Sequence, residues 1–108
     1  MIRQLSPRDL KQWLDDDKRP QPVLLDVREP WEFGVCRIEG AQHIPMRTIP
    51  LRLAELDRDA ELVVVCHHGA RSYQVAMFLQ HHGYTRLHNL HGGVAGWARE
   101  VDPTMPTY

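Results

Sequence analysis

The hydrophobic residues of this chain occur in short clusters with two different spacings. Continuous apolar runs at residues 23–25 and 62–65 are typical of strands that are buried on both faces of a parallel sheet. Elsewhere, apolar residues recur three and four positions apart, which is the spacing of one face of a helix. The pattern therefore predicts short strands that alternate with helices.

Local start and stop signals place the helices. Ser6 is a candidate N-cap with Pro7 in the first helical turn, and this helix is expected to end in the polar stretch 15–20. Pro30 can open a short helix, and Thr48 is expected to cap another. Two more helices are expected, one from Ser72 to a stop at Gly83 and one with its apolar face at residues 94–101. Further extended segments are expected at residues 2–5, 42–45 and 86–90.

The length and composition are those of an ordinary globular domain, with 108 residues, 43% hydrophobic and 25% charged. We expect one α/β domain over residues 1–108, with a small doubly wound parallel sheet of about five strands and helices on both faces. The net charge of -1 gives no electrostatic basis for binding nucleic acid or an anionic membrane. No apolar segment is long enough to span a bilayer, and the first residues lack the pattern of a signal peptide. A cytoplasmic monomer is therefore expected.

One stretch combines residues suited to catalysis, Cys-His-His-Gly-Ala-Arg-Ser at residues 66–72. It joins an expected strand to an expected helix, and Gly69 allows a tight turn between them. Consecutive backbone N–H groups of such a turn face one small concavity at the positive end of the helix, which stabilises an anion. A thiolate is an anion, so Cys66 is the candidate nucleophile, with Arg71 as a nearby positive charge.

Other strands are followed by charged residues or glycines. Asp26 and Arg28 come directly after the first apolar run, and Gly92 and Gly93 follow a later strand. Ligands of an open α/β sheet bind outside the carboxyl ends of its strands, so these residues are expected to line one rim with Cys66. Asp26 and Arg28 have a second interpretation, in which they pair with each other or cap backbone groups.

The spacing between Cys66 and Arg71 separates classes of cysteine enzyme. A cysteine-based phosphatase needs its arginine one position later, where this chain has Ser72, because a longer loop wraps a tetrahedral phosphate. The shorter loop of this chain suits a group smaller than phosphate. The outer sulfur of a persulfide on Cys66 is negative at neutral pH and fits such a ring of N–H donors.

Histidines are enriched, with seven in the chain and two adjacent pairs, His67-His68 and His81-His82. Adjacent histidines point apart, and a loop that directs amides at a thiolate competes with metal ligation, so no metal is expected. The second pair ends a helix, where a protonated histidine complements the helix dipole. His67 and His68 are expected to shape the mouth of the pocket or to select the molecule that brings sulfur to Cys66.

These motifs together resemble the rhodanese-like sulfurtransferases. The resemblance covers almost the whole chain, and its residues are Asp26-Val27-Arg28-Glu29, Gly40-Ala41 with His43-Ile44-Pro45, residues 66–72, Gly83-Tyr84, and Gly92-Gly93 with Trp97. Each motif alone is weak evidence, but their joint spacing is specific. The resemblance implies a single rhodanese-like domain with its active cysteine in the loop from Cys66 to Arg71.

The resemblance also implies a transfer in two steps without a cofactor. The Cys66 thiolate attacks the outer sulfur of a small donor such as thiosulfate, releases sulfite and becomes a persulfide. Cyanide in an assay, or a thiol or protein in the cell, then accepts the sulfur. The residues expected to bind the substrate are Arg71, His67, His68, Gly69, Ala70 and Ser72, supported at the rim by Asp26, Arg28, Gly92 and Gly93.

The sequence departs from the family pattern at Cys36, where many relatives carry glycine, and at His43, where asparagine is frequent. Cys36 is expected to be a small buried apolar residue. The alternative is a resolving thiol that attacks a modified Cys66.

Three functions follow from these observations. The first is an active sulfurtransferase, and the second is a persulfide relay or a non-catalytic module that binds a partner. The third is an arsenate reductase or phosphatase, which the loop length disfavours.

Overall fold

A five-stranded parallel sheet forms the centre of the computed structural model, which describes residues 1–108. The strand order is β1-β5-β4-β2-β3, and every neighbouring pair is parallel. The strands are β1 (Ile2–Leu5), β2 (Val23–Asp26), β3 (Gln42–His43), β4 (Leu62–Val65) and β5 (Leu87–Leu90). The expected parallel α/β sheet is therefore confirmed.

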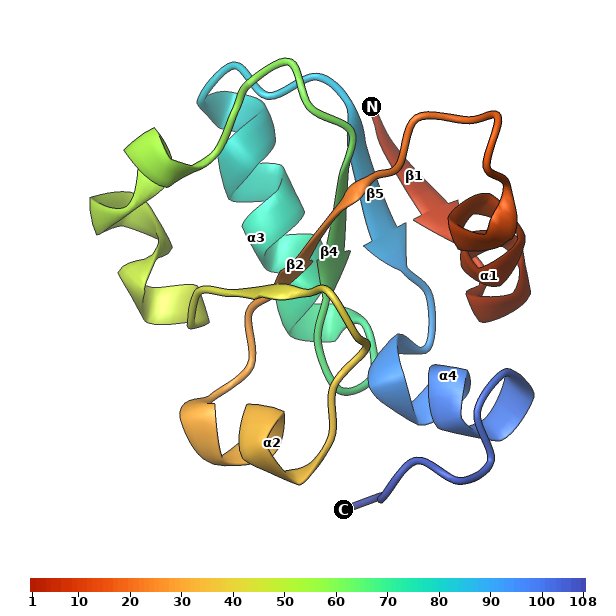
Figure 1. Cartoon of the computed structure of the whole chain (residues 1–108). Coiled ribbons are helices and arrows are strands. Elements are labelled where there is room, and N and C mark those ends of the chain that lie inside the picture. The colour runs from red at the N-terminus through yellow and green to blue at the C-terminus, as the bar shows by residue number, and fades with distance from the viewer.

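Helices cover both faces of this sheet, with α1 and α4 on one face and α3 on the other (Figure 1). They are α1 (Pro7–Asp15), α2 (Pro30–Val35), α3 (Ala70–His81) and α4 (Gly93–Glu100), with the 3-10 helices η1 (Met46–Leu51) and η2 (Leu53–Glu55) between β3 and β4. None of these helices is both long and apolar enough to cross a membrane.

The central strand β4 contributes to two separate cores because its side chains alternate between the faces of the sheet. Leu62 and Val64 pack in the core beneath α3, whereas Val63 and Val65 pack in the core beneath α1 and α4. All four are buried, which explains the continuous apolar run. Cys66 follows directly and belongs to the core beneath α3.

Two helix starts differ from the sequence-based expectations. Helix α3 begins at Ala70 rather than Ser72, because Gly69 adopts the left-handed conformation with φ +106° and serves as its N-cap. Thr48 does not cap a helix; it lies inside η1 and donates its hydroxyl hydrogen to the carbonyl of Pro45 at 2.8 Å. The first difference places Arg71 in the first turn of α3.

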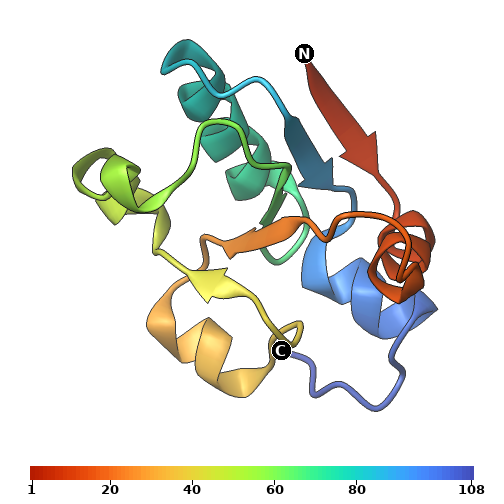
Figure 2. The ribbon, with the colours of Figure 1, turned by 45° about the horizontal axis from the view of Figure 1, so that its top comes forward.

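The C-terminal residues run back from α4 toward α2 (Figure 2). The ring of Tyr108 lies 5.3 Å from that of Trp31 on α2, in an edge-to-face arrangement. This tail had no interpretable sequence pattern, yet it reaches the end of the sheet where Cys66 lies.

Candidate active site

Cys66 lies between the end of β4 and the N-terminus of α3, and it is 1% exposed. Its Sγ atom accepts a hydrogen bond from the backbone N–H of Gly69 at 3.0 Å. This donor belongs to the N-cap of α3, so the sulfur lies at the positive end of a helix. The loop thus brings the sulfur to a backbone N–H donor.

The N-terminus of α4 holds this loop in place through hydrogen bonds. Helix α4 follows β5, the strand next to β4 in the sheet. The N–H of Val94 donates to the carbonyl of Cys66 at 2.9 Å, and that of Ala95 donates to the carbonyl of His67 at 3.0 Å. The backbones approach so closely that a Cβ atom at Gly93 would lie 2.3 Å from the His67 oxygen and 2.4 Å from the Cys66 oxygen. Glycine is therefore required at position 93, and Gly92 precedes it as the N-cap of α4.

A chain of hydrogen bonds under the loop fixes the direction of the contact between Cys66 and Ser72. Asn89 donates its amide hydrogens to the carbonyl of Gly69 at 3.1 Å and to Gln4 Oε1 at 3.0 Å. Its own oxygen therefore faces Ser72 and accepts the hydroxyl hydrogen. Ser72 Oγ, 3.3 Å from the Cys66 sulfur, is left with only lone pairs to offer, so it accepts from the S–H group of the neutral thiol.

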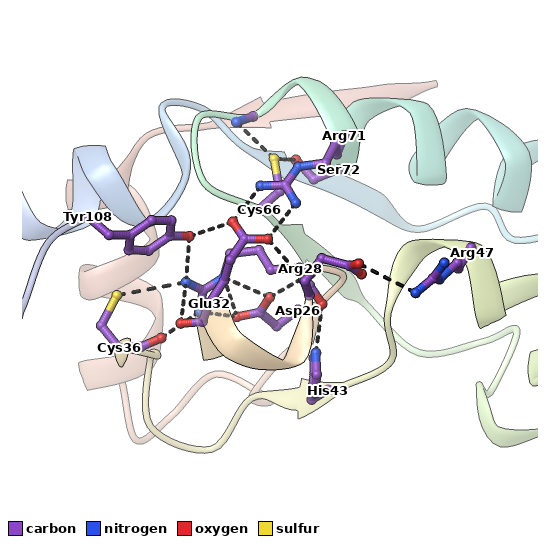
Figure 3. Close-up of polar contacts among 12 residues, drawn as sticks. Asp26, Arg28, Glu32, Cys36, His43, Arg47, Cys66, Arg71, Ser72 and Tyr108 are labelled. Carbon is purple, nitrogen blue, oxygen red and sulfur yellow. Dashed lines mark hydrogen bonds and ion pairs between the residues drawn. The ribbon is translucent and has the colours of Figure 1, made fainter. Parts of the chain in front are cut away.

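Arg71, in the first turn of α3, forms a bidentate ion pair with Glu32 of α2 (Figure 3). Its Nη1 and Nη2 atoms lie 2.7 and 2.8 Å from Glu32 Oε1 and Oε2. The hydrogen bonds to Arg71, together with those from the backbone and Tyr108, outweigh burial and lower the pKa of Glu32 from 4.5 to about 2. Glu32 is thus a permanent negative charge beside the loop.

The sequence analysis did not identify Glu32. A local signal exists, because the Glu29 and Glu32 side chains form a capping box at the start of α2. That signal predicts a helix start but says nothing about the guanidinium of Arg71, which is 39 residues away in the chain.

Asp26 and Arg28 form a second ion pair, buried beneath the first. Arg28 Nη2 lies 2.7 Å from Asp26 Oδ2, and the two side chains are 0% and 1% exposed. Arg28 also donates to the carbonyls of Cys36 at 2.6 Å and Glu32 at 3.3 Å. These contacts match the second interpretation of the sequence, mutual pairing and backbone capping, and neither side chain is open to a ligand.

Tyr108 connects the two ion pairs. Its role here does not follow from the sequence pattern. Its hydroxyl accepts a hydrogen bond from Arg28 Nη1 at 2.9 Å and donates one to Glu32 Oε2 at 2.8 Å (Figure 3). Burial is the main cause that raises the pKa of Tyr108 to about 12, so the hydroxyl remains protonated and able to donate.

The two histidines after Cys66 lie on the outer side of the loop. The ring of His67 stacks on that of Tyr108 at 4.1 Å and contacts that of His68 at 4.0 Å, so these adjacent histidines do not point apart as the sequence predicts. Burial, followed by the proximity of His68, lowers the pKa of His67 and favours its neutral form. His68 is exposed.

Cys36 is a free thiol like Cys66, and it is 8% exposed. It follows α2 and packs in the core beneath α1 and α4, whereas Cys66 packs in the core on the other face of the sheet. No group of three or more histidine, cysteine, aspartate or glutamate side chains is arranged to hold a metal ion.

A cavity of about 490 Å³ lies beside Arg71, between α3 and η1. Val75 and Phe78 of α3 and Ile49 of η1 provide apolar walls, and Arg47 is a second guanidinium in its lining. Arg71 thus borders both the Glu32 carboxylate and a space large enough for a small molecule.

A parallel α/β sheet with a cysteine between its central strand and the N-terminus of a helix defines the class of protein. The family model of the rhodanese-like domain matches residues 6–100, and the chain belongs to this family. It is a sulfurtransferase of the rhodanese family, as its relatives indicate.

Several relatives match the chain over most of their own length. A protein named sulfurtransferase from Allochromatium vinosum is 38% identical over 105 residues, which cover 97% of this chain and 96% of that protein. The thiosulfate sulfurtransferase GlpE of Pseudomonas aeruginosa is 32% identical over 102 residues, 94% of this chain and 88% of that protein. The crystal structure of a rhodanese-like domain protein from Staphylococcus aureus matches with a TM-score of 0.83 and 29% identity, over 92% of this chain and 94% of that one.

Proposed function

We propose that this protein transfers a sulfane sulfur from a small donor such as thiosulfate to a nucleophilic acceptor through a persulfide on Cys66. The observation that carries the proposal is the hydrogen bond from the Gly69 N–H to the Cys66 sulfur at the N-terminus of α3. An N–H donor at a helix N-terminus stabilises an anionic sulfur, and both the attacking sulfur of Cys66 and the outer sulfur of the persulfide are anionic in this reaction.

In the first step the Cys66 thiolate attacks the outer sulfur of thiosulfate. A new S–S bond forms, the S–S bond of the donor breaks, and sulfite leaves with the bonding electron pair. In the second step cyanide or a thiolate attacks the outer sulfur of the persulfide, and the Cys66 thiolate is the leaving group. Charge and atoms balance in both steps without a metal or a redox cofactor.

The loop residues have distinct roles in this scheme. Backbone N–H groups of residues 67–71 hold the outer sulfur. Arg71 attracts the negatively charged donor and offsets the negative charge of the sulfite as it leaves. Ser72 accepts the S–H hydrogen of the resting thiol. His67 and His68 form the outer side of the loop, with His67 covered by Tyr108.

Mass spectrometry of the intact protein tests the proposal. After reduction and incubation with thiosulfate, the wild type should gain one sulfur atom and lose it again on addition of cyanide. Cys66→Ser should gain none. Cys36→Ser is the matched control, because it removes the other free thiol and should still gain the sulfur.

Two results would contradict the proposal. If the wild type gains no sulfur from thiosulfate or other sulfane donors, a partner-binding module without catalysis explains the fold better. If Cys36→Ser abolishes the gain and Cys66→Ser does not, the nucleophile has been assigned to the wrong cysteine.

A further inference from the structure

Glu32 is a charged group that the transfer scheme leaves without a function. Both of its oxygens are fully engaged: Oε1 accepts from Arg71 Nη1 at 2.7 Å and from the Glu29 N–H at 2.9 Å. Oε2 accepts from Arg71 Nη2 and from the Tyr108 hydroxyl, both at 2.8 Å. A carboxylate offers about four acceptor positions, and here each has a donor. The carboxylate is therefore fixed in place.

This arrangement cancels the charge that Arg71 would otherwise present to an anion. The Glu32 side chain is only 5% exposed, so water screens its charge poorly. A donor that approaches Arg71 is attracted by the guanidinium and repelled by the carboxylate bound to it. Both interactions grow with the charge of the donor, because the interaction energy is proportional to the product of the charges, so the attraction that Glu32 cancels is larger for a doubly charged donor than for a singly charged one.

We propose that Glu32 determines donor specificity, by favouring sulfane sulfur donors with a single negative charge over doubly charged thiosulfate. This inference rests on the proposed sulfur transfer and specifies its substrate class. An organic thiosulfonate, R–SO2–S⁻, belongs to the favoured class. The Cys66 thiolate takes its outer sulfur, the S–S bond of the donor breaks, and a singly charged sulfinate leaves with the electron pair.

Thiosulfate and methanethiosulfonate form a matched pair of probes, because both deliver an outer sulfur from an oxidised sulfur atom and differ by one negative charge. The measurement is kcat/KM for each donor with cyanide as acceptor, expressed as the ratio of thiosulfate to methanethiosulfonate. For Glu32→Gln this ratio should rise about tenfold above that of the wild type, because a buried negative charge has been removed.

Two further variants separate charge from structure. Glu32→Asp keeps the charge while it shortens the side chain, so its donor ratio should stay within about twofold of the wild type even if both rates fall. Glu39→Gln removes a negative charge from an exposed position in the loop after α2, and its ratio should equal that of the wild type.

The inference is overturned if Glu32→Gln leaves the donor ratio unchanged, or if Glu32→Asp shifts it as much as Glu32→Gln does. In the latter case the shape of the side chain matters and its charge does not. A wild type that takes sulfur from both donors, with no ratio change in Glu32→Gln, refutes only the role of Glu32. A wild type that takes sulfur from neither donor refutes the proposed transfer itself, and the donor specificity with it.

Discussion

The ion pairs Asp26–Arg28 and Glu32–Arg71 use the same chemistry at two depths of one site. Both have a shortest N–O distance of 2.7 Å. In the deeper pair both side chains are at most 1% exposed, whereas Arg71 is 36% exposed. The deeper arginine holds backbone carbonyls of α2 and the residue after it. The outer one lies at the end of the cysteine loop, in the first turn of α3, and lines the cavity between α3 and η1.

The difference in depth separates structural from chemical roles. A buried guanidinium such as that of Arg28 has no access to a substrate, and its N–H groups donate hydrogen bonds within the protein. A half-exposed one such as Arg71 can interact with a ligand while one side remains held by Glu32. The hydroxyl of Tyr108 bonds to both pairs, so the C-terminal tail stabilises them together.

Removing the deeper arginine should have the largest effect on stability. Arg28→Met leaves Asp26 as a buried charge without a partner, and we expect the free energy of unfolding to fall by about 3–5 kcal/mol. Urea denaturation followed by circular dichroism measures this change. Arg47→Met is the control, because Arg47 is 82% exposed and lies 3.6 Å from Glu29, and it should cost less than about 1 kcal/mol. Equal losses in the two variants would contradict the structural role of Arg28.

Acid should weaken the outer pair. The folded pKa of Glu32 is about 2, below its ordinary 4.5, so its contribution to stability is fully present above pH 4.5 and is lost as the pH falls toward 2. The shift corresponds to at most about 3 kcal/mol. The stability difference between wild type and Glu32→Gln, measured by denaturation at several pH values, should shrink over this interval. A constant difference would show that the pair contributes no such stability.

Changing the outer arginine should lower the activity. Arg71→Lys keeps the charge but loses the planar group that bonds to both oxygens of Glu32, so we expect kcat/KM for sulfur transfer to fall about tenfold. Steady-state kinetics with cyanide as acceptor test this. Arg99→Lys, on the exposed side of α4, should behave as wild type. Wild-type kinetics in Arg71→Lys would remove Arg71 from the proposed mechanism.

The smallest expected effect concerns the link between the two pairs. Tyr108→Phe removes one hydrogen bond to Arg28 and one to Glu32 from a partly exposed side chain, so the free energy of unfolding should fall by about 1 kcal/mol. Tyr73→Phe is the control, because Tyr73 is 39% exposed on α3. If both variants unfold at the same urea concentration, the tail does not stabilise the pairs.

The sequence predicted the parts of the fold that depend on neighbours in the chain. The apolar run at β4 and the glycine after Cys66 predict a buried strand followed by a tight turn, and the structure contains both. Helix α3 begins two residues before the start that the sequence predicts, because helical periodicity does not reveal that Gly69 adopts a left-handed conformation.

The long-range contacts of the site do not follow from the sequence pattern. Asp26 and Arg28 are two positions apart, and their pairing was one of the interpretations that the sequence allowed. Glu32 and Tyr108 were not identified, because their partners lie 39 and 76 residues away in the chain. Local patterns carry no information about such contacts.

The sequence by itself therefore determined the class of fold, the loop with its candidate nucleophile and the family, because all three follow from the order and spacing of residues along the chain. Only the tertiary structure decided which carboxylate each arginine meets. It placed Asp26 with Arg28 out of reach of solvent and brought Glu32 to Arg71 beside Cys66 (Figure 3). The physical reason is that the packing of α2 and the C-terminal tail against the end of the sheet sets both the distance between opposite charges and their exposure to water.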